Sequence, residues 1–474
     1  MTVGPDYVPP EVKLPEKWNA APPGGYEQEA SGLSTWWEQL GDPLLTDLVK
    51  KAVEGNNDLR TAVARVRESR AVLGISRAGQ YPGLDASASA RKSHRDVETD
   101  GVSSTGDTDS YSAGLDASWE VDLFGGRRRS VEAAMADLSA QEESLRAVQV
   151  SLAAEVALTY VKIREYQRRT EVTKKNLDAL REEAGMVRIR RDSGLTSDLD
   201  LAQAEEALAS TESQLPSLHA GLNVSLNSMA ILLGMQPGAM NEELSVPAPV
   251  PSPPARIAAT LPADLLRRRP DIRLAERRLA AETARVGVAA SELYPKLSLS
   301  GSFVYEDMET DSDGVISAAK GSTTGFGPTV RWPVFRAGAI RRNMEAQDAR
   351  QEQALIAYEQ TVLTAMGEVE NSLRSLREFE SEASLLRRAV VAARQAEELQ
   401  AILYRTGLED FESLLTARKN LLQLEDRLAS SEASVVSELI RLYKALGGGW
   451  SPASQRTSAG SPAYLADTHR RPDR

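Results

Sequence analysis

The sequence predicts a mainly α-helical chain with a small β part, in which one structural unit occurs twice. Shifting the 474-residue chain by 213 positions aligns residues 58–234 with residues 271–447 without a gap. Each copy contains about 65 consecutive residues without proline and two short stretches in which apolar and polar residues alternate. Because helices and strands have these different periods, we expect long helices and one antiparallel β-hairpin in each copy.

The evidence for the repeat comes mainly from matches between residues of rare types. Between the copies, Tyr81-Pro82 falls on Tyr294-Pro295, Trp119 on Trp332, Gly194-Leu195 on Gly407-Leu408, and Leu233-Gly234 on Leu446-Gly447. Common helix-forming residues match by chance far more often than these do. We therefore divide the chain into an extended N-terminal segment (1–45), a first repeat (46–245), a proline-rich linker (246–262), a second repeat (263–450) and a flexible tail (451–474).

The same order of elements is expected in both repeats. In the first, a helix ends before Tyr81 and is followed by a β-hairpin at 83–122, a long helix at 127–192 and a returning helix at 197–234. In the second, a helix ends before Tyr294 and is followed by a β-hairpin at 296–335, a long helix at 338–405 and a returning helix at 411–446. Loops rich in Ser, Thr, Asp and Gly, at 97–110 and 307–324, leave about ten residues for each strand.

The long helices are expected to pack in coiled-coil fashion. Apolar residues spaced by sevens, threes and fours mark one side of the first: Leu138, Leu145, Val148, Leu152, Val156, Ile163 and Tyr166. At about 1.5 Å per residue, such a helix is roughly 100 Å long, which no single globular core requires. Gly194 and Gly407 end the long helices at matching positions. The sequence therefore predicts two long helical hairpins.

The composition excludes several classes of protein. The chain has no cysteine, and 68 acidic against 56 basic side chains give a net charge of −12. A disulfide scaffold, a thiolate metal site and a cysteine nucleophile are therefore excluded, and the acidic balance argues against a nucleic-acid partner. The sequence has no HExxH, GxSxG, GxxxxGK or GxGxxG motif, so we expect no enzyme activity, no catalytic residue and no cofactor.

One acidic stretch resembles a calcium-binding loop. Glu309-x-Asp311-x-Asp313-Gly314 offers alternating oxygen ligands, but the glutamate that closes such a loop is missing. Glu98, Asp100 and Gly101 precede Asp311, Asp313 and Gly314 by the repeat distance. We interpret both stretches as a repeated polar surface turn and predict no metal site.

The location of the protein is left open by these features alone. No stretch approaches the roughly 20 apolar residues that a spanning helix needs. The N-terminal stretch MTVGPDYVPPEVKLPEKW has neither the basic nor the apolar region of a signal peptide. The sequence therefore fits either a cytosolic protein or the mature form of an exported one.

The number of strands bears on function. Four alternating strands of about ten residues have the length of strands that cross a bilayer, but four cannot close a barrel. Since hydrocarbon tolerates no open sheet edge, several chains must then share one barrel. Three copies give twelve strands, whereas two give eight, which side chains largely fill, so counting favours three without proving it. A small soluble β-layer remains the alternative interpretation.

Several segments together resemble one family along most of the chain. They are VGPDYVPP at the start, TWWEQLGDPLLTDLV at 35–49, NNDLRTAVARV at 56–66 and LRRRPDIRLAERRLAAETARVGVAASELYPKLSLSG at 266–301. The chain is similar to the TolC-type outer-membrane efflux channels, and most similar to the lipoprotein branch that partners multidrug pumps of the RND type.

The resemblance implies a homotrimer with a shared twelve-stranded transmembrane β-barrel in outer-membrane lipid and a periplasmic α-barrel of twelve helices. It also implies a passive function: such a channel conducts drugs or other small toxic compounds from an inner-membrane pump and a periplasmic adaptor to the exterior of a Gram-negative bacterium. The rival hypothesis is a periplasmic helical scaffold or adaptor without a pore, which would need no detergent. The exported substrate cannot be read from the sequence.

Two positions depart from the family pattern. Members of the lipoprotein branch begin their mature chain with an acylated cysteine where Met1 stands, so we expect the lipid anchor to be missing here. The family often carries an aspartate at the position of Thr416, so its gate does not transfer directly to this chain.

The resemblance assigns roles to the two turns and to the residues beside them. Adaptor contact is expected at the periplasmic tip, formed by Gly194, Leu195, Thr196, Gly407, Leu408 and Glu409. A periplasmic gate is expected from Asp198, Asp200, Tyr404, Arg405, Asp410 and Glu412, whose carboxylates would form rings in a trimer. The plainer interpretation is that the glycines end helices and that the acidic residues belong to ordinary helix starts.

Overall fold

The structure is a computed structural model that describes residues 2–11, 14–15, 17–19, 33–99, 102–254, 268–312 and 315–450. The chain forms two compact units. We call residues 1–11, 65–142 and 274–359 the sheet unit, and residues 12–64, 143–273 and 360–474 the helical unit. The tail at 451–474 and part of the linker, 255–262, lie outside the described residues.

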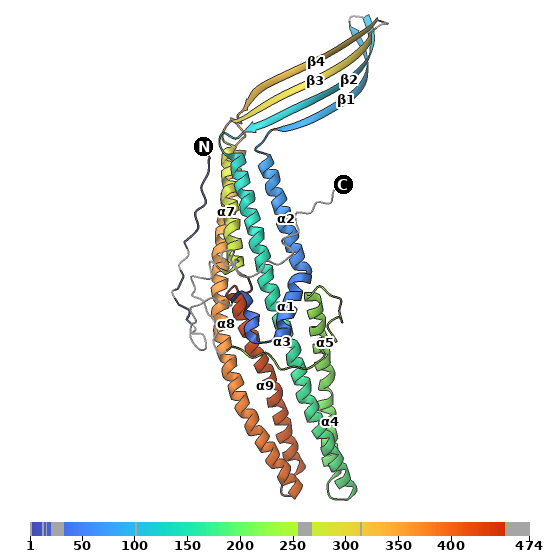
Figure 1. Ribbon diagram of the computed structural model, residues 1–474, viewed down its shortest axis with the longest axis vertical. Helices are drawn as coiled ribbons and strands as arrows, with labels where there is room; N and C mark the ends of the chain where they lie inside the picture. Colours follow the sequence, from blue (N-terminus) through green and yellow to red (C-terminus); the bar gives the residue numbers. More distant parts are fainter. Residues whose placement is uncertain are drawn as a thin grey trace. The chain divides into compact units, whose positions relative to one another are not determined.

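Within the described residues, the sheet unit contains one antiparallel sheet of four strands (Figure 1). They are β1 (Gly83–Thr99), β2 (Val102–Val121), β3 (Lys296–Ser312) and β4 (Val315–Arg331), in that spatial order. The hairpins of the two repeats are joined because β2 also pairs with β3, so that Leu115 lies opposite Phe303. Among these strands, β1 and β4 have one neighbour each, which leaves two unpaired edges.

The strands are longer than the predicted ten residues, and the predicted polar loops at 97–110 and 307–324 are wrong. Each strand has 17 to 20 residues, and most of both polar stretches belong to the ladder. Oppositely charged side chains pair across neighbouring strands in these stretches: Lys92 lies 3.5 Å from Asp109, and Lys320 lies 2.8 Å from Asp307. Glu309 and Asp311 accordingly lie in β3 and not in a surface turn.

The helical unit is built around two helical hairpins. The first joins α3 (Gly126–Asp192) to α4 (Asp198–Glu212) and α5 (Gln214–Leu232), and the second joins α8 (Ala339–Thr406) to α9 (Phe411–Ala445) (Figure 1). Along the part of α3 in this unit, the predicted apolar positions Leu152, Val156 and Ile163 are buried. Among the described residues, the other helices are α1 (Pro43–Gly55), α2 (Asn57–Ala78) and α7 (Pro270–Ser291), and most of α7 belongs to the sheet unit.

Two expectations about these helices need correction. The predicted single returning helix at 197–234 is divided at Ser213 into α4 and α5. Pro216 explains the break, because its ring collides with the carbonyl of Glu212 and it has no N–H to donate. The predicted extended segment 1–45 contains the 3-10 helix η1 (Leu33–Leu40) and the first residues of α1, which Asp42 caps by accepting from the N–H of Leu44 at 3.0 Å.

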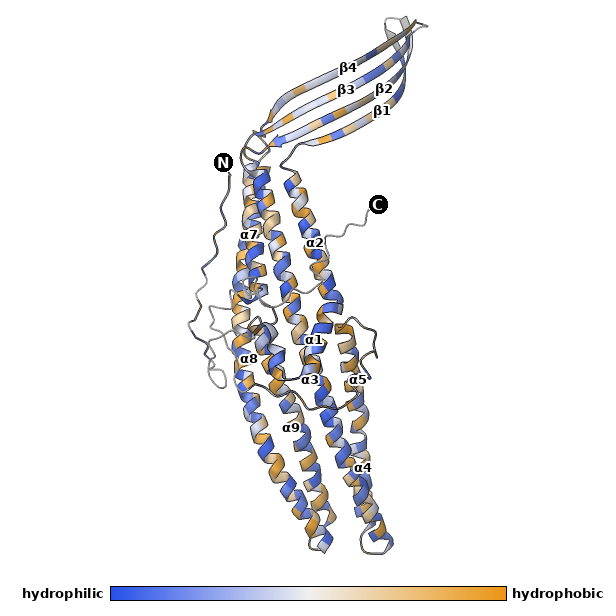
Figure 2. Ribbon diagram, viewed as in Figure 1, coloured by the Kyte–Doolittle hydropathy of each residue, from blue (hydrophilic) through white to orange (hydrophobic). Residues whose placement is uncertain are grey.

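Polar and apolar residues are mixed along the helices (Figure 2). In the part of the chain that the structure describes, no helix has a stretch apolar and long enough to cross a membrane.

Candidate tip and gate

The two hairpin turns end their long helices in the same way. Gly194 has φ +71° and Gly407 has φ +76°, so both adopt the left-handed conformation that favours glycine. The N–H of Leu195 donates to the carbonyl of Arg190 at 2.8 Å, and the N–H of Leu408 donates to that of Leu403 at 3.0 Å. This is the Schellman ending of a helix, formed twice. The following leucine side chains stay exposed, 69% for Leu195 and 74% for Leu408.

Two of the predicted gate carboxylates begin the returning helices. Asp200 and Ser197 form a capping box at α4, and Asp410 accepts from the N–H of Ser413 at 2.8 Å at α9. The hydroxyl of Thr196 donates to Asp200 and lowers the pKa of that carboxyl, while the Ser413 N–H lowers the pKa of Asp410. Both side chains are therefore ionised at neutral pH.

The structure brings these two helix starts together, because Leu201 of α4 and Phe411 of α9 lie in one buried cluster. The charge of Asp200 opposes the lowering of the Asp410 pKa. Asp198 is exposed, with a carboxylate oxygen 3.5 Å from Nε of Arg191. The side chains of Arg405, Glu409 and Glu412 are also exposed.

Tyr404 lies in an apolar cluster that joins both hairpins. Its ring packs on Phe411 with centroids 5.5 Å apart, and the guanidinium of Arg190 lies 5.0 Å from its centroid. The cluster also contains Val187 of α3 and Leu201 of α4. Burial raises the pKa of the Tyr404 hydroxyl, which has no hydrogen-bond partner among the described residues.

A buried charge cluster that the sequence did not reveal links the hairpins. Nη1 of Arg418 in α9 lies 2.7 Å from Oε2 of Glu183 in α3, as an ion pair without hydrogen-bond geometry, and Nη2 bonds Glu397 in α8. Side-chain exposure is 14%, 8% and 13% for Arg418, Glu183 and Glu397. Burial raises the pKa of Glu183, while Arg418 opposes the rise. We call these three residues the Arg418 cluster.

A comparison of the two repeats could have pointed to this cluster. The residue that matches Glu183 in the second copy is Ala396, and the residue that matches Glu397 in the first copy is Ala184. Each copy thus carries a charge where the other carries alanine.

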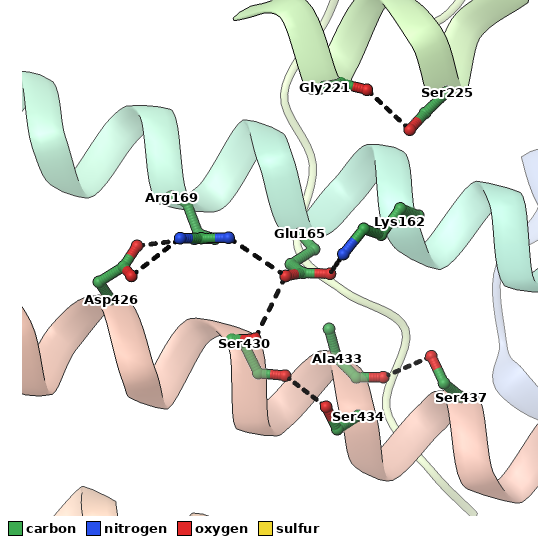
Figure 3. A network of polar contacts seen from close by, with 10 residues as sticks. All are labelled: Lys162, Glu165, Arg169, Gly221, Ser225, Asp426, Ser430, Ala433, Ser434 and Ser437. Carbon is green, nitrogen blue, oxygen red and sulfur yellow. Dashed lines mark hydrogen bonds and ion pairs between the residues drawn. The ribbon is translucent and has the colours of Figure 1, made fainter. Parts of the chain in front are cut away.

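A second polar network joins α3 to α9 (Figure 3). Arg169 binds Asp426 with two hydrogen bonds of 2.7 and 3.0 Å, and Glu165 is held by Lys162 at 2.9 Å. The hydroxyl of Ser430 also donates to Glu165, at 3.3 Å. Charged contacts therefore join the two hairpins at two places, the Arg418 cluster and the contact between Arg169 and Asp426.

The described residues thus form an open antiparallel sheet and two helical hairpins that end in exposed turns. A sequence model of the outer membrane efflux protein family matches residues 48–235 and 261–448, once in each predicted repeat. The chain belongs to this family.

Individual relatives agree with this assignment. The pyoverdine export outer membrane protein OpmQ of Pseudomonas aeruginosa is 32% identical over 93% of this chain and 92% of its own length. The solvent efflux pump outer membrane protein SrpC of Pseudomonas putida is 30% identical over 94% and 95%. The solved structure of the outer-membrane channel OprN superposes with a TM-score of 0.82 at 34% identity, over 95% of this chain and all of that one.

The protein is therefore an outer-membrane efflux channel of a Gram-negative bacterium that extends into the periplasm. Its fold combines an α-barrel with a β-barrel that neighbouring protomers share. The predicted family is confirmed, and the rival hypothesis of a scaffold without a pore is wrong. The family and these relatives are channels and not enzymes.

Proposed function

We propose that three copies of this chain form a duct that passively conducts drugs or other small toxic compounds from an inner-membrane pump and its periplasmic adaptor to the exterior. The sheet with two unpaired edges carries the proposal. Peptide groups at such edges are too costly to leave bare in hydrocarbon, and three copies supply twelve strands. One face also leaves Leu84, Leu115, Phe303 and Phe326 between 45% and 81% exposed, which suits contact with lipid.

Mass measurement in detergent, with channel recording on the same sample, tests this proposal. We expect the mass of three 51.4-kDa chains and a discrete conductance in planar bilayers. A monomer without conductance would contradict both the trimer and the duct.

The adaptor is proposed to bind the exposed turns Gly194-Leu195-Thr196 and Gly407-Leu408-Glu409. Both turns have the same backbone geometry and hold a leucine out in water, where it gains nothing from folding. An exposed apolar side chain gains free energy when a partner protein covers it. Two equivalent turns in each of three chains give six docking positions.

Replacing both leucines by serine (Leu195→Ser with Leu408→Ser) is expected to weaken adaptor binding about tenfold or more, because two apolar anchors are lost. Thermal stability should not change, since both side chains are exposed. Binding of the cognate adaptor to the detergent-solubilised channel is the measurement. Ile231→Ser is the control, because Ile231 is 62% exposed but lies in α5, away from the turns. Equal binding by the double variant and the control would exclude the turns as the docking site.

The gate is proposed to be formed by rings of carboxylates, which three-fold symmetry makes from Asp198, Asp200, Asp410 and Glu412 where the helices converge. The lowered pKa values of Asp200 and Asp410 support permanent charge on these rings. Ionised rings bind cations and so restrict the passage of other solutes. Tyr404 and Arg405 would support the gate without belonging to the rings. Tyr404 packs in the apolar cluster that joins the hairpins, and the charge of Arg405 favours the ionised form of Glu183.

Removing two ring charges with Asp198→Asn and Asp410→Asn is expected to raise the closed-state conductance, on the order of twofold, because the rings then hold fewer cations. Asparagine keeps the N-cap that Asp410 provides, so the start of α9 is preserved. Single-channel recording in planar bilayers is the measurement, with Asp410→Ala as the variant that loses both the charge and the cap. An unchanged closed level in the asparagine variant would remove these residues from the gate.

A further inference from the structure

The N-terminal segment, residues 2–7, packs against α3 and α7 within the sheet unit. Gly4 lies so close to α7 that a Cβ atom added to it would be 2.4 Å from Cα of Gly287. A Cβ atom added to Gly125, just before α3, would be 2.6 Å from Cγ2 of Thr2. Glycine on both sides therefore makes room for the segment, and we call this place the first segment site.

The side chain of Arg129 holds the segment in the first segment site. Its Nε donates to the carbonyl of Val3 at 3.1 Å, and its Nη2 donates to the carbonyl of Gly4 at 3.3 Å and to Oδ1 of Asp6 at 2.7 Å. Glu132 accepts from its Nη1 at 2.7 Å, and only 4% of the Arg129 side chain is exposed. The site therefore fits an extended segment with a carboxylate two residues after a glycine.

The repeat supplies the same groups a second time. The residues that match Gly125, Arg129, Glu132 and Gly287 are Gly338, Arg342 and Glu345 near the start of α8 and Gly74 in α2. Arg342 donates to Glu345 at 2.5 Å, but 80% of its side chain is exposed. Beyond the local backbone, no described atom lies within 4 Å of a Cβ atom added to Gly338 or Gly74. Within the described part of one chain, these groups are uncovered.

Neighbouring copies bring the two halves of this second segment site together. Within the chain, α3 follows β2 and α7 leads into β3 (Figure 1), and because β2 pairs with β3, the helices meet: Arg285 of α7 lies 2.6 Å from Asp137 of α3. Closing a barrel pairs β4 with β1 of the next copy. Since α8 follows β4 and α2 leads into β1, Gly338 and Arg342 then meet Gly74 of the partner subunit. A trimer has six segment sites but only three N-terminal segments.

We propose that the second segment site, at each junction between copies, binds an extended segment of another protein in which a glycine is followed two residues later by aspartate or glutamate. The proposal rests on the trimer proposed above. The glycine passes over the partner subunit's Gly74, as Gly4 passes over Gly287, and the carboxylate pairs with Arg342, as Asp6 does with Arg129. The N-terminal segments of the trimer cannot fill these sites, because their tethers keep them at high effective concentration in the first segment sites.

Two contacts of the first segment site have no counterpart in the second. Tyr7 donates to Glu276 at 3.2 Å, but the residue that matches Glu276 is Val63. Phe124, whose carbonyl accepts from the segment at 3.1 Å, is matched by Ala337, which has a left-handed φ of +46°. The glycine and the carboxylate alone therefore define the partner segment.

A labelled synthetic peptide TVGPDY, which copies residues 2–7, tests the second segment site. Fluorescence anisotropy with the full chain in detergent should show saturable binding of three peptides per trimer. Arg342→Ala should raise the dissociation constant about tenfold or more, because charge-assisted hydrogen bonds are lost. Arg341→Ala, which removes an exposed neighbouring charge, is the matched control and should leave the dissociation constant unchanged.

Altered peptides test the two recognition elements. The peptides with Gly4→Ala and Asp6→Asn should each bind about tenfold more weakly, the first through a collision and the second through a lost charge. Unchanged binding by Arg342→Ala, or by both altered peptides, would overturn the site. Binding only to a variant that ends at Trp450 would make the tail the occupant and overturn the assignment to another protein. A trimer that binds no peptide contradicts this site alone, whereas a monomer by mass contradicts the trimer itself.

Discussion

Replacing Arg418 by alanine is expected to lower the free energy of unfolding by about 3 kcal/mol, the cost of leaving buried carboxylates without their cation. Glu183 and Glu397 would remain as two like charges, in α3 and α8, with only 8% and 13% of their side chains exposed. Their repulsion acts between the two hairpins, so the hairpins should also separate near the tip. The measurements are the midpoint of thermal unfolding in detergent and the single-channel conductance, and we expect the midpoint to fall and the conductance to rise.

The neighbouring lysine provides a matched control. Lys419 pairs with Glu206 of α4 at 3.0 Å, but both side chains are more than half exposed. Lys419→Ala should therefore change the free energy of unfolding by no more than about 0.5 kcal/mol. Combining Arg418→Met with Glu183→Gln and Glu397→Gln removes all three charges and should recover most of the lost stability. Equal effects of Arg418→Ala and Lys419→Ala would show that the Arg418 cluster does not hold the hairpins together.

Gly234→Ala is expected to lower the free energy of unfolding by about 3 kcal/mol or more, because it combines backbone strain with a collision. Gly234 ends α5 with φ +72°, a conformation that costs alanine about 1 kcal/mol by itself. A Cβ atom there would also lie 2.2 Å from the carbonyl oxygen of Gly55, so α1 and α5 would have to separate. The midpoint of thermal unfolding is the measurement.

Gly194→Ala separates the two contributions. Gly194 has nearly the same backbone conformation, with φ +71°, but no atom of the described structure lies within 4 Å of the added Cβ atom. Only the strain of about 1 kcal/mol should remain. If both alanine variants lose the same stability, the contact between Gly234 and Gly55 is not a tight one.

The differences between prediction and structure have local physical causes. The predicted loops are wrong because Ser, Thr, Asp and Gly signal turns when they are considered alone. In the sheet the same residues sit opposite partners that stabilise the ladder, as Lys320 does for Asp307. The break in the first returning helix was readable in principle, since Pro216 stands inside the predicted span. No proline interrupts α9, which continues for 35 residues.

Part of the candidate site was also readable from the sequence. The glycines of the two turns and the exposed leucines after them follow from backbone conformation, which acts between residues close together in the chain. The roles of Asp200 and Asp410 as helix caps follow from the same local rules. Tyr404 was expected at the gate, but its position inside the apolar cluster depends on how four helices meet.

The sequence by itself determined the architecture: two copies of a unit, long helices that reverse at Gly194 and Gly407, and strands too few to close a sheet. These features depend on periodicity and backbone preference, which neighbours in the chain set. Only the tertiary structure decided which charges meet in the Arg418 cluster, which glycines are packed against backbone, and which side of α3 and α9 residues 247–253 cover. Contacts such as Arg418 with Glu183 and Gly234 with Gly55 join residues more than a hundred positions apart, and their energies arise only once the helices lie side by side.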